Sequence, residues 1–235
     1  MTVQPQQPKS ILYIPAHKEN FIAKAAQRGA DVIALDLEDA VPAELKAQAR
    51  EQLLPLCRQY LAQQKVWVRV NRPWTLLLKD LEQIVDQQVS AIILPKTDNT
   101  ARLRFIDEAL TEIEQQKELP IGHTGIIGFI ESVDGLYNAR EIAHASPRLI
   151  GLGMGTEDFA LAMGMQNTPA TLYGPCQQLV MAARSANIQP IGLVGSMAEF
   201  RDLELYQQQL EQGFELGFSA AFCIHPNQVS LVNQI

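Results

Sequence analysis

Short, almost continuously apolar runs alternate along the chain with segments whose apolar residues recur at helical spacing. The apolar runs predict eight strands, at 11–16, 32–37, 66–71, 91–96, 125–131, 148–154, 190–195 and 219–225. Runs of such uniform apolar character are typical of parallel strands that are buried on both faces. Between them, apolar residues share one helical face at 53–61, 103–113 and 200–214.

Eight strand–helix units in 235 residues predict a (β/α)8 TIM barrel, a fold that typically occupies roughly 250 residues. An open doubly wound sheet is the alternative, but no G-x-G-x-x-G phosphate loop follows the first predicted strand. We expect one barrel domain over 10–235. A flexible leader over 1–9, polar and rich in proline and glutamine, precedes it.

Composition narrows the class of protein. Hydrophobic residues make up 47% and charged residues 19% of the chain, as in globular proteins. A net charge of -7 argues against nucleic-acid binding, and no apolar run reaches the length of a membrane span or a signal segment. We therefore expect a cytoplasmic protein without a membrane or nucleic-acid partner. Three scattered cysteines predict reduced thiols, and four scattered histidines argue against a zinc site.

Polar residues gather where the predicted strands end, which is the end of a TIM barrel that carries function. They are Asp36 to Asp39, Arg69, Asn71, Lys96, Glu131, Glu157, Asp158 and His225. Glu131 and Asp158 follow neighbouring predicted strands, and hard carboxylate oxygens are the ligands that Mg²⁺ prefers. The alternative is that each carboxylate caps the helix that follows it, which after Glu131 is expected from Ser132 to Ala143, because acidic side chains favour helix amino termini.

Two basic residues face these acids. Arg69 lies between two valines in the third predicted strand, so its side chain can point into the barrel mouth. There its guanidinium can grip a substrate carboxylate, form a buried salt bridge with Asp36 or Glu38, or do both. Lys96 is either the Schiff-base lysine of a metal-free aldolase or, as we favour, an ion-pair partner of the nearby acids.

Glycines alternate along the sixth predicted strand, at Gly151, Gly153 and Gly155. Their spacing predicts a close approach of neighbouring backbone. It also leaves the amides of Gly155, Thr156, Glu157 and Asp158 free to bind an anion at a helix start.

Several motifs follow one another over nearly the whole chain. They are ILYIPA at 11–16, G-A-D-x-x-x-L-D-L-E-D-A-V-P at 29–42, V-R-V-N at 68–71, L-P-K at 94–96, I-E-S at 130–132, A-R-E-I-A-x-A-S-P-R at 139–148, G-x-E-D at 155–158 and I-H-P-N-Q-V at 224–229. In this order they resemble the citrate lyase beta-subunit group within the HpcH/HpaI aldolase family.

The resemblance implies a TIM barrel that assembles as a homo-oligomer, either a trimer or a hexamer. It implies Mg²⁺ held by Glu131 and Asp158, with Arg69 on the carboxylate or keto group of the substrate. Members of the family cleave or form C–C bonds in thioesters such as citryl-, citramalyl- and malyl-CoA, with an acyl-CoA and a 2-keto acid as the two halves. By the same resemblance, Lys9 or Lys18 would hold a phosphate of coenzyme A.

Some roles stay open. Asp36, Glu38 and a metal-bound hydroxide are the candidates for the general base. The chain departs from the family pattern at Lys9, at Ala16, at Gly192 and at 217–221, and we expect it to lack a C-terminal lid beyond Ile235. These departures keep two alternatives alive. One is a class II aldolase acting on free 4-hydroxy-2-keto acids, and the other is a lyase-like protein that binds metal and keto acid without turnover.

Overall fold

The computed structural model describes residues 7–235. Most of the leader that we expect over 1–9 lies outside the described residues. Within its described part, the amide of Lys9 donates to the Asp31 carboxylate at 2.7 Å, and the carbonyl of Lys9 accepts from the Ala221 amide at 2.9 Å. The described end of the leader is therefore hydrogen-bonded to the barrel.

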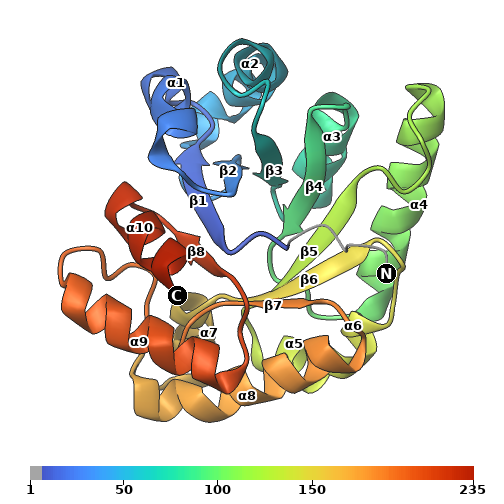
Figure 1. The fold of residues 1–235 in the computed structure, drawn as a ribbon. Helices are drawn as coiled ribbons and strands as arrows, with labels where there is room; N and C mark the ends of the chain where they lie inside the picture. The colour runs from blue at the N-terminus through green and yellow to red at the C-terminus, as the bar shows by residue number, and fades with distance from the viewer. Residues whose placement is uncertain (1–6) are drawn as a thin grey trace, which may run out of the picture.

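Eight parallel strands form one sheet that curves into a barrel (Figure 1). They are β1 (Ser10–Pro15), β2 (Val32–Asp36), β3 (Lys65–Arg69), β4 (Val89–Leu94), β5 (Gly125–Ile130), β6 (Leu149–Met154), β7 (Gln189–Ile191) and β8 (Ala221–Cys223). Their order in the sheet is β7-β6-β5-β4-β3-β2-β1-β8. The barrel closes through a parallel bridge between Ile191 and Ala220, so the predicted TIM barrel is confirmed.

Helices surround the sheet on the outside (Figure 1). They are α1 (Glu19–Ala25), α2 (Lys46–Tyr60), α3 (Trp74–Ile84), α4 (Thr100–Gln116), α5 (Val133–Tyr137), α6 (Ala139–Ala143), α7 (Thr156–Met163), α8 (Pro169–Ser185), α9 (Leu203–Leu216) and α10 (Pro226–Gln234), with short 3-10 turns at Ala26–Arg28 and Ala43–Leu45. None of the helices within 7–235 is long and apolar enough to cross a membrane.

Alternation along the strands divides the core into two parts. One apolar cluster fills the barrel interior and includes Trp67, Phe129 and Phe222, all nearly inaccessible to solvent. A larger cluster packs between the sheet and the helices. All three cysteines are free and buried, and burial raises the pKa of each thiol to about 12, so none is a reactive thiolate at neutral pH.

Two predicted elements differ from the structure. The strand expected at 190–195 ends at Ile191. The Gly192 amide still donates to the Ala220 carbonyl at 2.8 Å, but beyond it the chain turns to α9: Val194 donates to the Gln209 carbonyl at 3.2 Å, and Ser196 to the Gln209 side chain at 3.2 Å. The helical segment expected from Ser132 to Ala143 divides at Asn138, whose side chain donates to the Asp98 carbonyl at 2.9 Å.

Candidate active site at the carboxyl end of the barrel

Five charged side chains that the sequence singles out lie at the carboxyl ends of neighbouring strands. Asp36 and Arg69 are the last residues of β2 and β3 and are paired in register. Lys96 follows β4, Glu131 follows β5, and Asp158 lies in the first turn of α7, directly after β6. Consecutive strands around the barrel thus bring the five groups to one rim, where Glu131 is near enough to Arg69 for the charge of the arginine to act on it.

Arg69 is bound by Asp36 in a bidentate geometry. Its Nε and Nη2 donate to the two carboxylate oxygens at 2.8 and 2.6 Å. Both groups are largely buried, since the side chains are 15% and 2% exposed. Asp36 also accepts the amides of Glu38 at 2.8 Å and Ala40 at 3.0 Å, so its oxygens are fully engaged. The Nη1 edge of Arg69 is not bound to Asp36 and is the edge available to a ligand.

Glu38 lies beside that edge. Its Oε2 is 3.4 Å from Nη1 of Arg69, while the more exposed Asp39 carboxylate is 3.6 Å away. Burial raises the pKa of Glu38 to about 7, with Arg69 opposing the rise and three neighbouring carboxylates adding to it. A carboxyl group with a pKa near neutrality can accept and return a proton at physiological pH.

Glu131 is a buried carboxylate with one strong donor. It is 7% exposed, and its Oε2 accepts the backbone amide of Lys96 at 2.7 Å. Within residues 7–235, no lysine, arginine or histidine forms an ion pair with it. Burial raises the pKa of Glu131 to about 7, although the Lys96 amide and the charge of Arg69 act against the rise. A carboxylate buried without a cation is costly unless a ligand provides one.

Gly155 permits this position of Glu131. A Cβ built at Gly155 would lie 2.5 Å from Cγ of Glu131 and 2.8 Å from its Oε1. The backbone of Gly155 has a φ of -91°, so it is the space, and not the conformation, that requires glycine. The predicted close approach along the glycine strand is therefore made here by a side chain. Gly153 has the same relation to the Phe129 ring, at 2.5 Å from its nearest atom.

Lys96 connects the two carboxylates that the sequence proposes as metal ligands. Its amide bonds Glu131, and its Nζ lies 3.1 Å from Oδ2 of Asp158. Both side chains of this ion pair are exposed by about two-fifths, at 43% and 41%. The hydrogen bond to Asp158 raises the pKa of Lys96, which keeps the amine protonated. A protonated amine is not a Schiff-base nucleophile, so the ion-pair interpretation of Lys96 is the one that the geometry supports.

Within residues 7–235, neither carboxylate makes a capping hydrogen bond, although Asp158 lies in the first turn of α7, where its charge suits the helix dipole. The amino terminus of α5 is capped by Ser132, whose Oγ accepts the Gly135 amide at 3.0 Å. The residue before α7 is Gly155, which has no side chain to cap it. Among the described contacts, the amides of Thr156, Glu157 and Asp158 have no backbone acceptor. The first turn of α7 therefore presents donors beside the two carboxylates, as the sequence predicts for an anion site.

The Glu157 side chain turns toward the loop after β7. Its two carboxylate oxygens accept hydrogen bonds from the hydroxyls of Ser196 and Thr156. This leaves the side chains of Glu131 and Asp158, and not that of Glu157, as the carboxylates beside Lys96. His225 caps α10 by accepting the Asn227 amide at 3.2 Å, and its ring stacks on Phe200.

Tyr13 belongs to this region, although the sequence marks it only as part of a strand. Its ring lies under the guanidinium of Arg69, with 5.0 Å from Cζ to the ring centroid, and stacks on Phe222 at 5.2 Å. Its hydroxyl is buried and has no hydrogen-bond partner among the described residues. Burial raises the pKa of Tyr13 well above its ordinary value, so the hydroxyl stays neutral. The alternation of inward positions along β1 was the signal that could have placed it here.

The two lysines predicted to bind coenzyme A lie at opposite ends of the barrel. Lys18 follows β1 and is exposed at the carboxyl end, one residue before α1. Lys9 precedes β1 at the amino end, where its amide bonds Asp31. The full length of β1 separates Lys9 from Arg69 and Glu131. The structure brings Lys18, and not Lys9, to the end of the barrel that carries the carboxylates.

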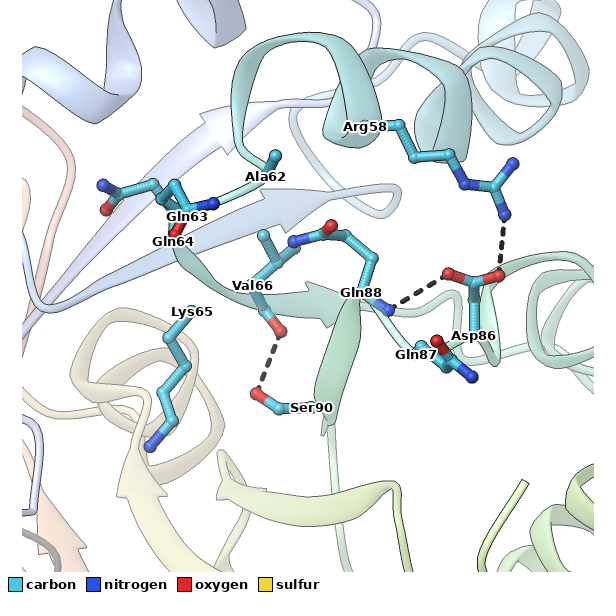
Figure 2. Close-up of a pocket in the computed structure, with 10 residues that line it drawn as sticks. All are labelled: Arg58, Ala62, Gln63, Gln64, Lys65, Val66, Asp86, Gln87, Gln88 and Ser90. Carbon is cyan, nitrogen blue, oxygen red and sulfur yellow. Dashed lines mark hydrogen bonds and ion pairs between the residues drawn. The ribbon is translucent and has the colours of Figure 1, made fainter.

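Hollows occur at both ends. At the carboxyl end, β1 and β8 pair no further than Leu12 and Cys223, and a mainly apolar cavity of about 360 Å³ opens beyond that point. Its lining includes Tyr13, Pro15, Phe21, Lys24, Arg28 and His225. At the amino ends of β3 and β4, a polar cavity of about 620 Å³ lies beside the Arg58–Asp86 ion pair. Figure 2 shows the residues that line it. Only the first cavity shares a residue, Tyr13, with the rim described above.

The donor set at the rim fits a divalent cation held by two protein carboxylates. Within residues 7–235, no three His, Cys, Asp or Glu side chains converge as a complete metal cage. Glu131 and Asp158 are bridged by Lys96 and supply only hard oxygen atoms. Mg²⁺ is bound in this way, through one or two carboxylates with waters or substrate oxygens completing an octahedron.

Known proteins are similar to this chain over nearly its whole length. A family model described as HpcH/HpaI aldolase/citrate lyase matches residues 9–226. A citrate lyase subunit beta-like protein of Deinococcus radiodurans is 31% identical, over 100% of this chain and 81% of its own length. An L-malyl-CoA/beta-methylmalyl-CoA lyase of Cereibacter sphaeroides is 32% identical, over 95% of this chain and 77% of its own. A crystal structure of CitE from Mycobacterium tuberculosis with magnesium and acetate has a TM-score of 0.76 and 25% identity, covering 97% and 90% of the two chains.

Proposed function

Because the chain belongs to the HpcH/HpaI aldolase/citrate lyase family, a family of carbon–carbon lyases, we propose that it is a Mg²⁺-dependent lyase of 3-hydroxyacyl-CoA thioesters. Its substrate is of the citryl-, citramalyl- or malyl-CoA type, and its products are an acyl-CoA and a 2-keto acid. The observation that carries the proposal is the buried Glu131 carboxylate, which has no cationic partner and lies beside Asp158 at the rim that also holds Arg69.

Glu131 and Asp158 are the proposed metal ligands. The relative from Mycobacterium tuberculosis was solved with magnesium, which supports this choice of ion. When bound, Mg²⁺ supplies Lewis-acid polarisation and a template for the oxygens of the 2-keto acid half. The amide of Lys96 fixes one oxygen of Glu131, so the other is free to face a cation.

Arg69 is the proposed anchor for the substrate carboxylate. Asp36 orients the guanidinium through two hydrogen bonds and leaves the Nη1 edge for the ligand. The ring of Tyr13 packs beneath the guanidinium and supports its orientation at the barrel mouth. The unpaired amides at the start of α7 are well placed to hold the oxygen that becomes negative as the C–C bond breaks.

Glu38 is the proposed general base. Cleavage requires that the hydroxyl proton of the substrate be removed while the electrons of the C–C bond pass to the acyl-CoA half as an enolate. The α-carbon of that enolate then takes up one proton to give the acyl-CoA. Asp36 is a poor acceptor for this proton, because Arg69 and two amides already occupy its oxygens. Glu38 has a pKa raised to about 7 and lies beside the free edge of Arg69.

The proposed place for the thioester half is the cavity beside the carboxyl ends of β1 and β8. That cavity shares Tyr13 with the rim, has apolar walls and carries Lys24 and Arg28. Exposed Lys18 directly precedes α1, the helix whose Phe21 and Lys24 line the same cavity. Such a combination suits a long pantetheine arm with phosphates at one end.

The homo-oligomer implied by the family resemblance, a trimer or a hexamer, remains part of the proposal and is tested by sedimentation velocity.

The test is a release assay with purified protein. With Mg²⁺, the wild type should release acetyl-CoA from citramalyl-CoA or malyl-CoA, or the equivalent acyl-CoA from citryl-CoA. Glu131→Gln and Asp158→Asn should each lower kcat/KM by more than about 100-fold and weaken Mg²⁺ binding, because each removes a charged ligand. Glu157→Gln is the matched control, and its loss should be much smaller.

Two results would contradict the proposal in different ways. Turnover of free 4-hydroxy-2-keto acids, with no release from any thioester, would replace it with a class II aldolase. Binding of Mg²⁺ and oxaloacetate without any turnover would leave a lyase-like binding protein.

A further inference from the structure

A lysine behind the acidic run after β2 is the feature that the proposed mechanism does not use. Lys46 is the first residue of α2. Its Nζ donates to the carbonyls of Leu37 and Glu38, at 2.8 and 2.7 Å, and to the side-chain oxygen of Asn71 at 2.7 Å. An ammonium group has three donors, so all of the hydrogen-bonding capacity of Lys46 is used on three oxygens of two neighbouring strand ends.

The position of Lys46 is electrostatically unfavourable for the helix that it begins. A cation in the first turn of a helix opposes the positive end of the helix dipole, and α2 has no acidic residue in that turn to balance it. The three oxygens that surround Nζ offset this cost. A lysine at this position is therefore explained by what its ammonium group holds and not by helix formation.

Asn71 links the ammonium group of Lys46 to buried side chains of α2 and α3. Its backbone and side-chain nitrogens both donate to Oδ2 of Asp80 at 2.8 Å, and Oδ1 of Asp80 accepts from Nε of Arg50 at 2.7 Å. Asp80 is fully buried and Asn71 is 2% exposed. These bonds orient the Asn71 amide so that its oxygen, not its nitrogen, faces Lys46. The end of β3 is thus fixed against α2 and α3.

The same ammonium group fixes the segment that carries Glu38. From the barrel side, Asp36 binds the amides of Glu38 and Ala40. From the helix side, Lys46 binds the carbonyls of Leu37 and Glu38. The backbone at Glu38 is therefore held on both sides, while Asn71 ties the same lysine to the strand end that carries Arg69. One side chain sets the spacing between the two groups that face the substrate.

We propose that Lys46 is a positioning residue, which sets the geometry of Glu38 relative to Arg69 without touching the substrate. Its consequence for turnover rests on the proposed lyase function, whereas its effect on the segment 36–41 does not. Lys46→Met removes the ammonium group and keeps the length of the side chain. Lys46→Arg keeps a cation with several donors, and Lys79→Met on the exposed face of α3 is the matched control.

Hydrogen exchange tests the inference without any substrate. The amides of Glu38 and Ala40 should exchange about 10- to 100-fold faster in Lys46→Met than in wild type, because a charge-assisted anchor is lost. Lys46→Arg should restore most of the protection, and Lys79→Met should change nothing. Wild-type exchange rates at these two amides in Lys46→Met would overturn the proposal. If Lys46→Met does not fold, Lys46→Gln is measured against the same criterion.

Kinetics provides the second measurement. Lys46→Met should lower kcat by about 10- to 100-fold, as expected for misplacement of a reacting group, while the Kd for Mg²⁺ stays within about 2-fold of wild type. A weakened Mg²⁺ affinity with unchanged kcat would also overturn the proposal. If the wild type releases no acyl-CoA, the lyase proposal fails on its own, and the exchange measurement still decides the role of Lys46.

Discussion

Two buried arginines lie at opposite ends of this barrel, and their surroundings differ in one respect. Arg148, just before β6, uses all five of its N–H donors: on Asp107 at 2.6 Å, twice on Glu114 at 2.9 and 2.7 Å, on Thr111 at 2.8 Å and on the Thr124 carbonyl at 3.3 Å. Arg69, at the end of β3, uses two donors on Asp36 and has Nη1 at 3.4 Å from Glu38. We call the network around Arg148 closed, because every donor of the guanidinium has an acceptor. We call the network around Arg69 open, because its Nη1 edge has no close hydrogen-bond acceptor within residues 7–235.

The titration of the neighbouring carboxylates reflects the same difference. Burial alone would raise the pKa of Glu114, but hydrogen bonds from Arg148, Thr124 and Gly122 outweigh it and hold the pKa below its ordinary value. For Glu38 and Glu131, burial prevails and raises the pKa to about 7. Removing one partner from a closed buried network leaves a buried charge uncompensated, whereas an open network keeps capacity for a ligand at a cost in stability.

The largest expected effect is the loss of the closed network. Arg148→Met leaves Glu114, which is fully buried, without its cation, and should lower the free energy of unfolding by about 3–5 kcal/mol. Arg69→Met should cost less than half of that, because Asp36 keeps two amide donors and the mouth is open to water. Urea unfolding of both variants at pH 7 makes the comparison. Equal losses would show that the two networks do not differ as proposed.

The next effect is on the pH dependence of stability, which should have opposite signs for Glu38 and Glu114. The pKa of Glu38 rises from 4.5 to about 7 on folding, so the native state binds more protons than the unfolded chain between these values. Stability from Glu38 is therefore fully present below pH 4.5 and is lost as the pH rises to about 7. Glu38→Gln should be more stable than wild type at pH 8, by an amount on the order of 2–3 kcal/mol, and no different at pH 4.

Glu114 provides the matched control with the reverse sign. Its pKa is lowered on folding, so its contribution is present above the ordinary carboxyl pKa and is lost as the pH falls through the lower value. Glu114→Gln should therefore destabilise the protein at pH 7, where Glu38→Gln is neutral or stabilising. Thermal unfolding of the metal-free protein from pH 4 to 8 measures both. A Glu38→Gln variant that is less stable than wild type at pH 8 contradicts the open-network interpretation.

A smaller effect is expected from filling the space beside Glu131. Gly155→Ala places a methyl group 2.5 Å from Cγ of Glu131, and relieving that overlap should cost about 1–3 kcal/mol. The displaced carboxylate should also bind Mg²⁺ more weakly, which calorimetric titration detects. Gly174→Ala is the control, because nothing lies within 4 Å of the new methyl group in the middle of α8. That variant should gain up to about 1 kcal/mol. Unchanged Mg²⁺ affinity in Gly155→Ala would remove Glu131 from the metal site.

The sequence predicts those features that depend on local pattern. Uniform apolar runs and helical spacing are properties of neighbouring residues, so the eight strands and the barrel follow from them. Arg69, Glu131 and Asp158 were found because each comes at the end of such a run. Early termination of β7 was not predictable in this way, since Val194 is as apolar as a strand residue and leaves the sheet only because Gln209 of α9 binds its amide.

Features that depend on backbone oxygens or on register were missed for a related reason. Two of the three partners of Lys46 are carbonyls, which carry no signature in the amino-acid letters. Tyr13 reaches Arg69 only because the tilt of the strands brings residues from different register positions together.

Lys9 is the opposite case, a residue whose predicted role its position does not support. Its closeness to the first strand in sequence suggested a ligand-binding role, although it lies at the wrong end of that strand for the carboxylates.

The smallest expected effect is on KM, from replacing the two lysines beside β1. Because Lys18 and Lys9 lie at opposite ends of the barrel, they test at which end the thioester binds. Lys18→Ala should raise KM for the acyl-CoA substrate by about 2- to 5-fold, the size of one exposed charge pair, and the effect should shrink at high salt. Lys9→Ala should leave KM unchanged, because its ammonium group lies at the amino end of the barrel. Initial rates at two ionic strengths make the measurement. A larger KM effect in Lys9→Ala than in Lys18→Ala would require the thioester to approach from the end of the barrel opposite Glu131.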